Sequence, residues 1–341
     1  MQTNEAVRIE QEYKAVKKSA GLMDFSTRIG KIQIKGKDAY KYIQNLVTAD
    51  ISCLCDKQGI HTLMCYPDGS VMDALVLYRL REDNYLIVIS SGNVEKTFKW
   101  LINRKRYHDI SINNLSEKLY QISLHGPKST IILKKLTGYS IEDMEHMNIQ
   151  LNVAISANKC IIAKMGYGGE DGYDIYVSWE DAKVVIDRIM KAGMLEGIVS
   201  VGIEIKNVLR YEAKLPLYGD ELPGDITPIE AGFEPYIRLD KEDFVGKQAL
   251  VKQHDRGIKR AVVAFQVNSK KEVPARGAEI LANNKKVGVV TGEHFSPKIK
   301  KSVGYAVVDL KNIDNCTKIY INNVDGPIEA KITSQKLQKC I

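Results

Sequence analysis

The pattern of hydrophobic and polar residues predicts that two stretches of the chain contain strands and helices in the same order. Apolar residues at every third or fourth position mark the helices, whereas alternating or short continuous apolar runs mark the strands. In the first stretch the expected elements are strands at 31–36, 71–80 and 84–90 and helices at 37–47 and 93–105. A strand at 119–126 and a helix at 127–136 open a second stretch with the same plan, which ends near residue 193. We therefore expect two α+β units related as a pseudo-repeat.

The segments that flank these units have other patterns. Apolar residues at helical spacing predict a helix over 5–20, which Gly21 should end. Another helix is expected within 202–216, and the loop that follows, 217–233, is rich in Gly, Pro and Asp. These segments are expected to connect the units.

The last part of the chain, from about residue 257, reads as short strands and turns. The Asn pairs at 283–284 and 322–323 stand where hairpin turns are expected. This part should form a small β-barrel or sandwich.

Length and composition limit the class of protein. A chain of 341 residues is too long for one ordinary hydrophobic core, so two or three domains are expected. No apolar run is long enough to cross a bilayer, and the first residues lack the basic and apolar segments of a signal peptide. We therefore expect a cytoplasmic protein that does not associate with membranes.

The net charge of +7 is spread over short lysine groups, such as 270–271 and 285–286. Nucleic-acid-binding proteins usually concentrate basic residues in one patch with aromatic residues between them. No such patch is visible, so we expect no nucleic-acid partner. A small anionic ligand suits the charge, although a solvated lysine-rich surface explains most of these residues.

Three of the six cysteines, Cys53, Cys55 and Cys65, lie near His61 in the sequence. They could be read as metal ligands, but the spacing is C-x-C and no second ligand pair follows. Reduced structural thiols are the better interpretation, and no metal site is expected.

Two polar stretches stand out because the usual motifs are missing. The glycine-rich segment 165–172 lies between two expected strands and opens no helix, so it lacks the context of a dinucleotide site. Immediately after it, Asp174 and Tyr176 share one face of a strand. The stretch 209–233 places several carboxylates beside an arginine. These acids would suit a ligand with NH groups, and equally a structural network within the loop.

Several segments resemble one known family in their residues and in their order along the chain. The segments are GLMDFS (21–26), PDGSVMDALVLYRL (67–80), LHGPKS (124–129), GYGGEDGYDIYV (166–177), LRYEAKLPLYGDELPGDITPIEAGF (209–233) and TGEHFSPKIKKSVGYAVV (291–308). Together they cover nearly the whole chain, and they resemble the folate-dependent aminomethyltransferase, or T-protein, family of the glycine cleavage system.

The resemblance implies an α+β fold: a three-domain cloverleaf with two α+β units and a C-terminal β-barrel around a central cavity for tetrahydrofolate. The expected first domain combines 1–30 with 115–218. A second, ferredoxin-like domain combines 31–114 with 219–256, and the barrel covers 257–341.

The resemblance also implies a set of folate-binding residues: Tyr78, Tyr167, Asp174, Lys206, Ser90, His61 and Tyr236. Asp174 stands where the family usually has the glutamate that holds the NH groups of the pterin. Lys206 replaces a family arginine and loses its two-pronged hydrogen bonding. Ser90 replaces a usual asparagine, and His61 stands where some members have a tyrosine.

The largest departure from the family lies at Asp73 and Ala74. The family has two successive aspartates there, and the second is credited with the one-carbon chemistry. In this chain that second position is Ala74. Because side chains alternate along a strand, Asp73 should point away from the cavity. Asp73 is the carboxylate left for catalysis only if a bulge turns it around.

These observations predict a tetrahydrofolate-dependent transferase of methyl or aminomethyl groups. The alanine at position 74 favours a demethylase-type member with a small-molecule donor, since direct methyl transfer can rely on positioning. The short ends of the chain relative to the family, before Glu5 and at 339–341, also weigh against the glycine cleavage reaction. The alternatives are a true aminomethyltransferase of that system, served by a carrier protein, and a non-catalytic folate-binding protein of the iron–sulfur assembly branch.

Overall fold

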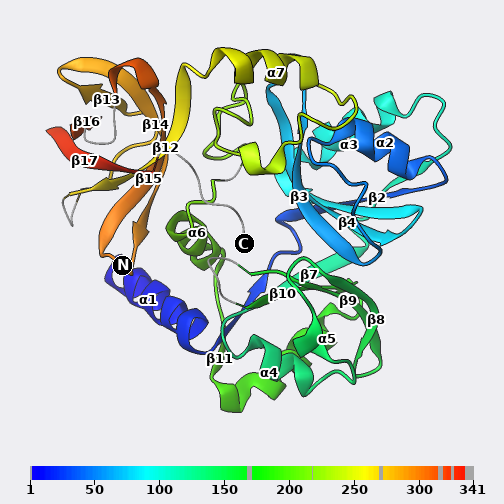
Figure 1. Ribbon diagram of the computed structural model, residues 1–341. Helices are drawn as coiled ribbons and strands as arrows, with labels where there is room; N and C mark the ends of the chain where they lie inside the picture. Colours follow the sequence, from blue (N-terminus) through cyan, green and yellow to red (C-terminus); the bar gives the residue numbers. More distant parts are fainter. Residues whose placement is uncertain are drawn as a thin grey trace.

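Three β-sheets form the framework of the computed structural model, which describes residues 2–166, 171–216, 218–268, 272–313, 318–323 and 326–334. One sheet has five strands, one has six, and the third closes into a barrel. Figure 1 shows them as three lobes arranged around helix α6 (Ile203–Glu212). The predicted α+β fold with a C-terminal barrel is confirmed.

The five-stranded sheet is antiparallel, with the order β3-β4-β5-β2-β6. Its strands are β2 (Ile29–Lys35), β3 (Gln58–Cys65), β4 (Val71–Arg81), β5 (Asn84–Ser90) and β6 (Ser111–Asn114). Helices α2 (Ala39–Leu46) and α3 (Val94–Arg104) cover one face. Leu75 and Leu77 of β4 belong to the core beneath these helices, so Ala74, Val76 and Tyr78 face the opposite side.

The six-stranded sheet has the order β11-β1-β7-β10-β9-β8. Its strands are β1 (Ala20–Asp24), β7 (Leu119–His125), β8 (Ile149–Ile155), β9 (Asn158–Lys164), β10 (Gly172–Ser178) and β11 (Ile198–Ser200). Only the β1–β11 pair is parallel among the pairings described for this sheet. Helices α4 (Ser129–Lys134) and α5 (Ala182–Gly193) pack on one face, where Ile122 and Ile175 are buried.

The barrel closes in the order β12-β15-β14-β13-β16-β17. Its strands are β12 (Arg260–Val267), β13 (Glu279–Ala282), β14 (Lys285–Ser296), β15 (Lys301–Asp309), β16 (Lys318–Asn323) and β17 (Gly326–Ser334). Asn283 and Asn284 both have positive φ and form the β13–β14 turn, as predicted. Asn322 and Asn323 are the last residues of β16 and pair with Pro327 and Gly326 of β17, so the expected hairpin is present but these two residues belong to its strand.

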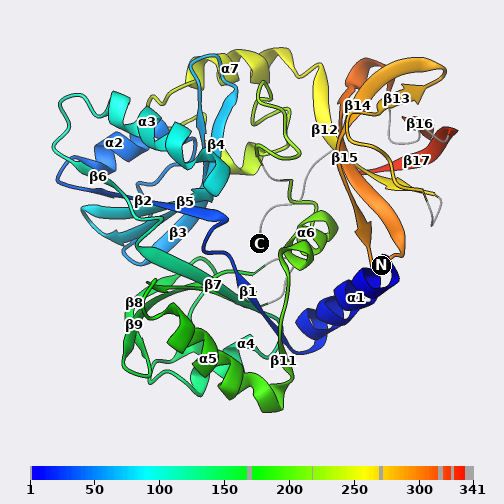
Figure 2. The same cartoon turned by 180° about the vertical axis from the view of Figure 1, so that it is seen from behind.

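The remaining helices connect the lobes. Helix α1 (Gln2–Lys18) runs along the outside from the barrel to the six-stranded sheet (Figures 1 and 2), and α7 (Lys247–Arg256) leads into β12. Short 3₁₀ turns are η1 (Ser91–Asn93), η2 (Ile141–Asp143), η3 (Met194–Glu196), η4 (Glu234–Tyr236) and η5 (Leu310–Asn312). No helix in the described ranges combines the length and apolarity needed to span a membrane.

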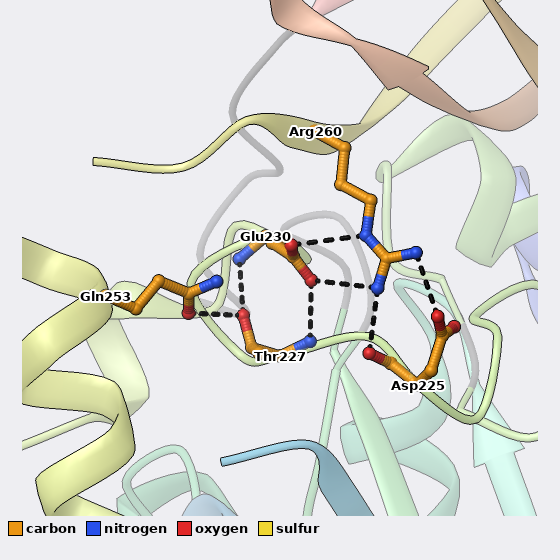
Figure 3. Close-up of polar contacts among 5 residues, drawn as sticks. All are labelled: Asp225, Thr227, Glu230, Gln253 and Arg260. Atoms are coloured by element: carbon orange, nitrogen blue, oxygen red, sulfur yellow. Dashed lines mark hydrogen bonds and ion pairs between the residues drawn. The ribbon is translucent and has the colours of Figure 1, made fainter. Parts of the chain in front are cut away.

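Two ion-pair networks fix the loop that follows α6. Arg210 of α6 donates to both carboxylate oxygens of Glu221, at 2.7 and 3.0 Å, and both side chains are buried. Further along, Arg260 of β12 donates to Asp225 at 2.9 Å and to Glu230 at 3.2 Å (Figure 3). The loop therefore joins α6 to the barrel.

Figure 3 also shows how the same loop is tied to α7. The Thr227 hydroxyl lies 2.7 Å from the side-chain oxygen of Gln253, a residue of α7. The backbone N–H of Thr227 donates to Glu230, and the backbone N–H of Glu230 donates to the Thr227 hydroxyl. The loop is thus bound to α6 through Glu221, to α7 through Thr227 and to β12 through Glu230.

The role expected for Gly21 was wrong. Helix α1 ends at Lys18, and Gly21 lies inside β1. A Cβ at this position would lie 2.5 Å from Val16 Cγ2 and 3.0 Å from Val201 Cγ2. The glycine is needed because α1 and the segment after β11 approach β1 closely, not because it stops a helix.

Replacing Gly21 with alanine should therefore lower the free energy of unfolding by about 1–3 kcal/mol, the usual cost of overpacking. Chemical denaturation of Gly21→Ala measures it. Gly138→Ala is the matched control, since no heavy atom lies within 4 Å of an added Cβ there. Equal stability of the two variants would contradict the packing argument.

Candidate functional site

A cavity of about 180 Å³ lies where the uncovered faces of the two open sheets meet. Helix α6 and the segments around Pro216 and Phe233 complete its wall. Helices α2 and α3 or α4 and α5 pack on one face of each open sheet, and the part of the opposite face that α1 and α6 leave uncovered lines the cavity. A larger hollow of about 970 Å³ lies between α2, the 104–108 loop and the start of α7, but none of the predicted site residues lines it.

The five-stranded sheet supplies most of the apolar wall. Its lining residues come from alternate positions of neighbouring strands, and they include His61, Leu63, Ala74, Val76, Tyr78, Val88 and Ser90. Leu63 pairs with Ala74 and His61 pairs with Val76 across β3 and β4. His61 is therefore the diagonal neighbour of Ala74 on the same face.

Asp73 faces away from the cavity, as the alternation predicted. Its carboxylate accepts hydrogen bonds from Thr97 Oγ1 at 2.7 Å and Asn93 Nδ2 at 3.0 Å, both next to or in α3. An irregularity is present, because Met64 pairs with Asp73 whereas the next residue pairs with Val71. It does not turn Asp73 towards the cavity. Burial raises the pKa of Asp73 to about 6, although these hydrogen bonds act in the opposite direction.

The six-stranded sheet and α6 supply the charged wall. Asp174 and Tyr176 of β10 line the cavity with Lys206 and Arg210 of α6. Asp174 is buried and accepts a short hydrogen bond from Ser123 Oγ. Burial lowers the pKa of Lys206 to about 8, and the negative charge of Asp174 opposes this shift. The wall therefore combines an anionic acceptor with a cation.

A second lysine lies close to the same carboxylate. Lys31 of β2 is fully buried, and its Nζ donates to the Ser26 carbonyl at 3.3 Å. Burial lowers the pKa of Lys31 to about 8, with Asp174 and Asp24 acting against the shift. Asp174 thus interacts electrostatically with two amines, one from a strand of the other open sheet and one from α6.

Gln121 is a lining residue that the sequence analysis missed. It lies on β7 opposite Tyr176, is 2% exposed, and its Oε1 has no hydrogen-bond partner within the described part of the chain. An unpaired buried acceptor beside a cavity is suited to a ligand donor. The sequence did contain a signal, since Gln121, Ser123 and His125 alternate with apolar residues in this strand.

Most of the predicted site residues do meet in this cavity. Of the residues that the sequence analysis singled out, those that line the cavity are His61, Ala74, Tyr78, Ser90, Asp174, Lys206 and Tyr236. Asp73 does not, and Tyr167 lies outside the described residues. Cys53 and Cys55 are exposed and Cys65 is buried, and the described residues contain no group of three potential metal ligands.

Comparison with known proteins agrees with this geometry. Residues 2–241 match the model of the GCVT N-terminal domain, and residues 260–339 match that of the glycine cleavage T-protein C-terminal barrel domain. The chain belongs to the glycine cleavage T-protein family. The resemblance inferred from the sequence is therefore confirmed, and the proteins of this family use tetrahydrofolate.

Individual relatives are similar over nearly the whole chain. An aminomethyltransferase of Thermoanaerobacter pseudethanolicus is 38% identical, over 97% of this chain and 89% of its own length. One of Caldanaerobacter subterraneus is 39% identical, over 97% and 88%. The structure of glycine cleavage system aminomethyltransferase T from Bartonella henselae has a TM-score of 0.86 at 23% identity, covering 97% of this chain and 91% of that one, which shows a shared fold. These relatives give no support to the demethylase-type function favoured from Ala74.

Buried His125 and half-buried His61 predict a loss of stability in mild acid. Burial lowers the pKa of His61 and of His125 to about 4. In the unfolded chain a histidine has a pKa of about 6.5, so it binds a proton below that pH while the folded form stays neutral. Stability is fully present above pH 6.5 and should fall by about 2 kcal/mol per histidine between pH 6.5 and 5.

Urea unfolding at several pH values measures this loss. His125→Gln should flatten the pH dependence in this interval, whereas the same change at the exposed His254 should leave it as in the wild type. An unchanged slope in His125→Gln would show that another group controls acid stability.

Proposed function

We propose that this protein is a tetrahydrofolate-dependent aminomethyltransferase that receives its one-carbon group from a lipoyl-bearing carrier protein and releases ammonia. The observation that supports this most is the cavity, in which Asp174, Gln121 and a set of aromatic side chains meet. The names of relatives that are 38% and 39% identical over nearly the full chain support the same reaction.

The lining residues fit a bound folate. A pterin ring presents N–H donors along one edge and an aromatic face. Asp174 and the unpaired Oε1 of Gln121 are acceptors on neighbouring strands, β10 and β7. Tyr78, Tyr176 and Phe233 supply aromatic surface around them. Bound tetrahydrofolate would supply the nitrogen nucleophile that accepts the one-carbon group.

The protein's own residues would then position this ligand and exclude water. Asp174 would accept hydrogen bonds from the pterin N–H groups, with the amines of Lys31 and Lys206 near the same carboxylate. Buried aromatic residues on both sheets would hold the ring and keep water away from it, which strengthens each polar contact. The residues thus act mainly by orientation.

A methyl donor is the second candidate, and the orientation of Ala74 is the observation that favours it. Ala74 lines the cavity, so this wall carries no carboxylate at the position that the family uses for aminomethyl transfer. A donor that is already activated needs less help from a charged group.

Turnover assays should separate these reactions. Purified protein with tetrahydrofolate and an aminomethylated lipoyl carrier protein should release ammonia and form 5,10-methylenetetrahydrofolate. Formation of 5-methyltetrahydrofolate from methylated amines, thioethers or methoxy compounds would favour the second candidate instead. Folate binding without turnover of any donor would indicate a non-catalytic protein.

Two carboxyl-to-amide substitutions test the assignment of Asp174. Asp174→Asn should weaken tetrahydrofolate binding by about 10- to 150-fold, because a charge-assisted hydrogen bond contributes roughly 1.5–3 kcal/mol. Asp73→Asn is the matched control and should bind folate as the wild type does, since Asp73 faces α3. Isothermal titration calorimetry gives both affinities, and weaker binding by Asp73→Asn alone would reverse the assignment.

A further inference from the structure

Among the lining residues of the five-stranded wall that the structure describes, His61 is the only histidine, the residue type that accepts protons most readily near neutral pH. The other titratable lining residues of that wall and the adjoining η4 are Tyr78 and Tyr236. Phenols titrate near pH 10 and are poor proton acceptors at neutral pH. Asp73, the nearest carboxylate in the sequence, is engaged with Thr97 and Asn93 on the far side of the sheet.

The imidazole is available to a ligand. Its ring packs edge-on against Tyr236 at 5.9 Å, and no hydrogen bond to His61 occurs within the described ranges. Burial, with a smaller contribution from nearby His146, lowers the pKa of His61 to about 4. The ring is therefore neutral at physiological pH and has one nitrogen lone pair to offer.

The position of His61 relates it directly to Ala74. The two residues are diagonal neighbours on one face of the β3–β4 ladder, because His61 pairs with Val76 and Leu63 pairs with Ala74. Diagonal neighbours lie roughly 7–8 Å apart, within the reach of long side chains. An alanine leaves space beside it, and the longer histidine side chain can extend towards this space.

We propose that His61 is the proton-transfer residue of this cavity and takes the part that a carboxylate at position 74 cannot take here. This inference rests on the proposed aminomethyltransferase function.

The proposed step balances without a further reactant. As the attacking nitrogen forms its bond to the one-carbon group, it becomes positively charged and must lose a proton. The His61 lone pair accepts that proton. When the bond between the carbon and the departing amine breaks, the imidazolium returns the proton to that amine, which leaves as ammonia, so His61 ends this step neutral. The carbon would then join the folate nitrogen to the carrier sulfur. Attack by the second folate nitrogen would break the carbon–sulfur bond, and the proton of that nitrogen would go to the departing thiolate, which gives 5,10-methylenetetrahydrofolate and the free carrier thiol. A weak base is sufficient, because the proton comes from a nitrogen that already carries positive charge.

Substitutions at positions 61 and 74 test the assignment. His61→Gln should lower kcat by about 10²–10⁴-fold, the usual contribution of a general acid–base group, with little change in the KM for tetrahydrofolate. The double variant with both Ala74→Asp and His61→Gln should have a kcat at least about tenfold higher than His61→Gln alone, because an aspartate at position 74 could take over the proton transfer. His146→Gln is the control, since it removes a nearby exposed imidazole that does not line the cavity.

A spectroscopic measurement on the wild-type protein complements the kinetics and is independent of whether a variant folds. With ¹⁵N-labelled histidine, the His61 ring resonances, identified by their loss in His61→Gln or by sequential assignment, should shift when tetrahydrofolate is added without donor. The other five histidines should shift less.

The outcomes are distinct. If the wild type turns over and His61→Gln is equally active, the role of His61 alone is overturned. The same holds if the His61 resonances do not shift at saturating folate. An equal effect of Ala74→Asp with and without His61 would also overturn it, since the residues would then act independently. Absence of aminomethyl transfer by the wild type would remove both the proposed function and this inference.

Discussion

The buried ion pair between Arg210 and Glu221 is the interaction on which the arrangement of the three lobes depends. The two side chains are only 6% and 3% exposed, and the guanidinium also donates to the Leu215 carbonyl at 2.7 Å. With both partners present the charges are satisfied, whereas loss of one would leave the other buried and unpaired. Arg210 also lines the cavity, so the same group that fixes the loop shapes the site.

The cavity follows from a simple property of the two open sheets. A helical layer covers one face of each, and the cavity-lining side chains lie at alternate positions on the other face. In β7 and β10 these positions are Gln121, Ser123 and Asp174, whose neighbours Ile122 and Ile175 are buried in the core. The alternation that places apolar side chains on the packed face therefore also places the polar side chains on the opposite face, which lines the cavity.

The same alternation explains what the sequence could predict. It was sufficient to place Asp174 and Tyr176 on one face and to turn Asp73 away, because these statements depend only on neighbouring residues. It was not sufficient for Gly21, whose role depends on the approach of Val16 and Val201 from other segments. The partner of Arg210 also depends on the path of a loop, which local pattern does not determine. Gln121 was detectable but looked like an ordinary strand residue, and the division into domains stays a prediction.

The place of β1 in its sheet has a consequence for the order in which the chain can acquire structure during synthesis. The strands of the five-stranded sheet all lie between residues 29 and 114, so this sheet can form while the rest is still being translated. Strand β1, although made earlier, pairs with β7 and with β11 at residues 198–200. It must wait for well over a hundred further residues before its second neighbour leaves the ribosome. Until then its apolar residues Leu22 and Met23, which are buried in the folded protein, have an incomplete sheet to join and stay exposed in the growing chain.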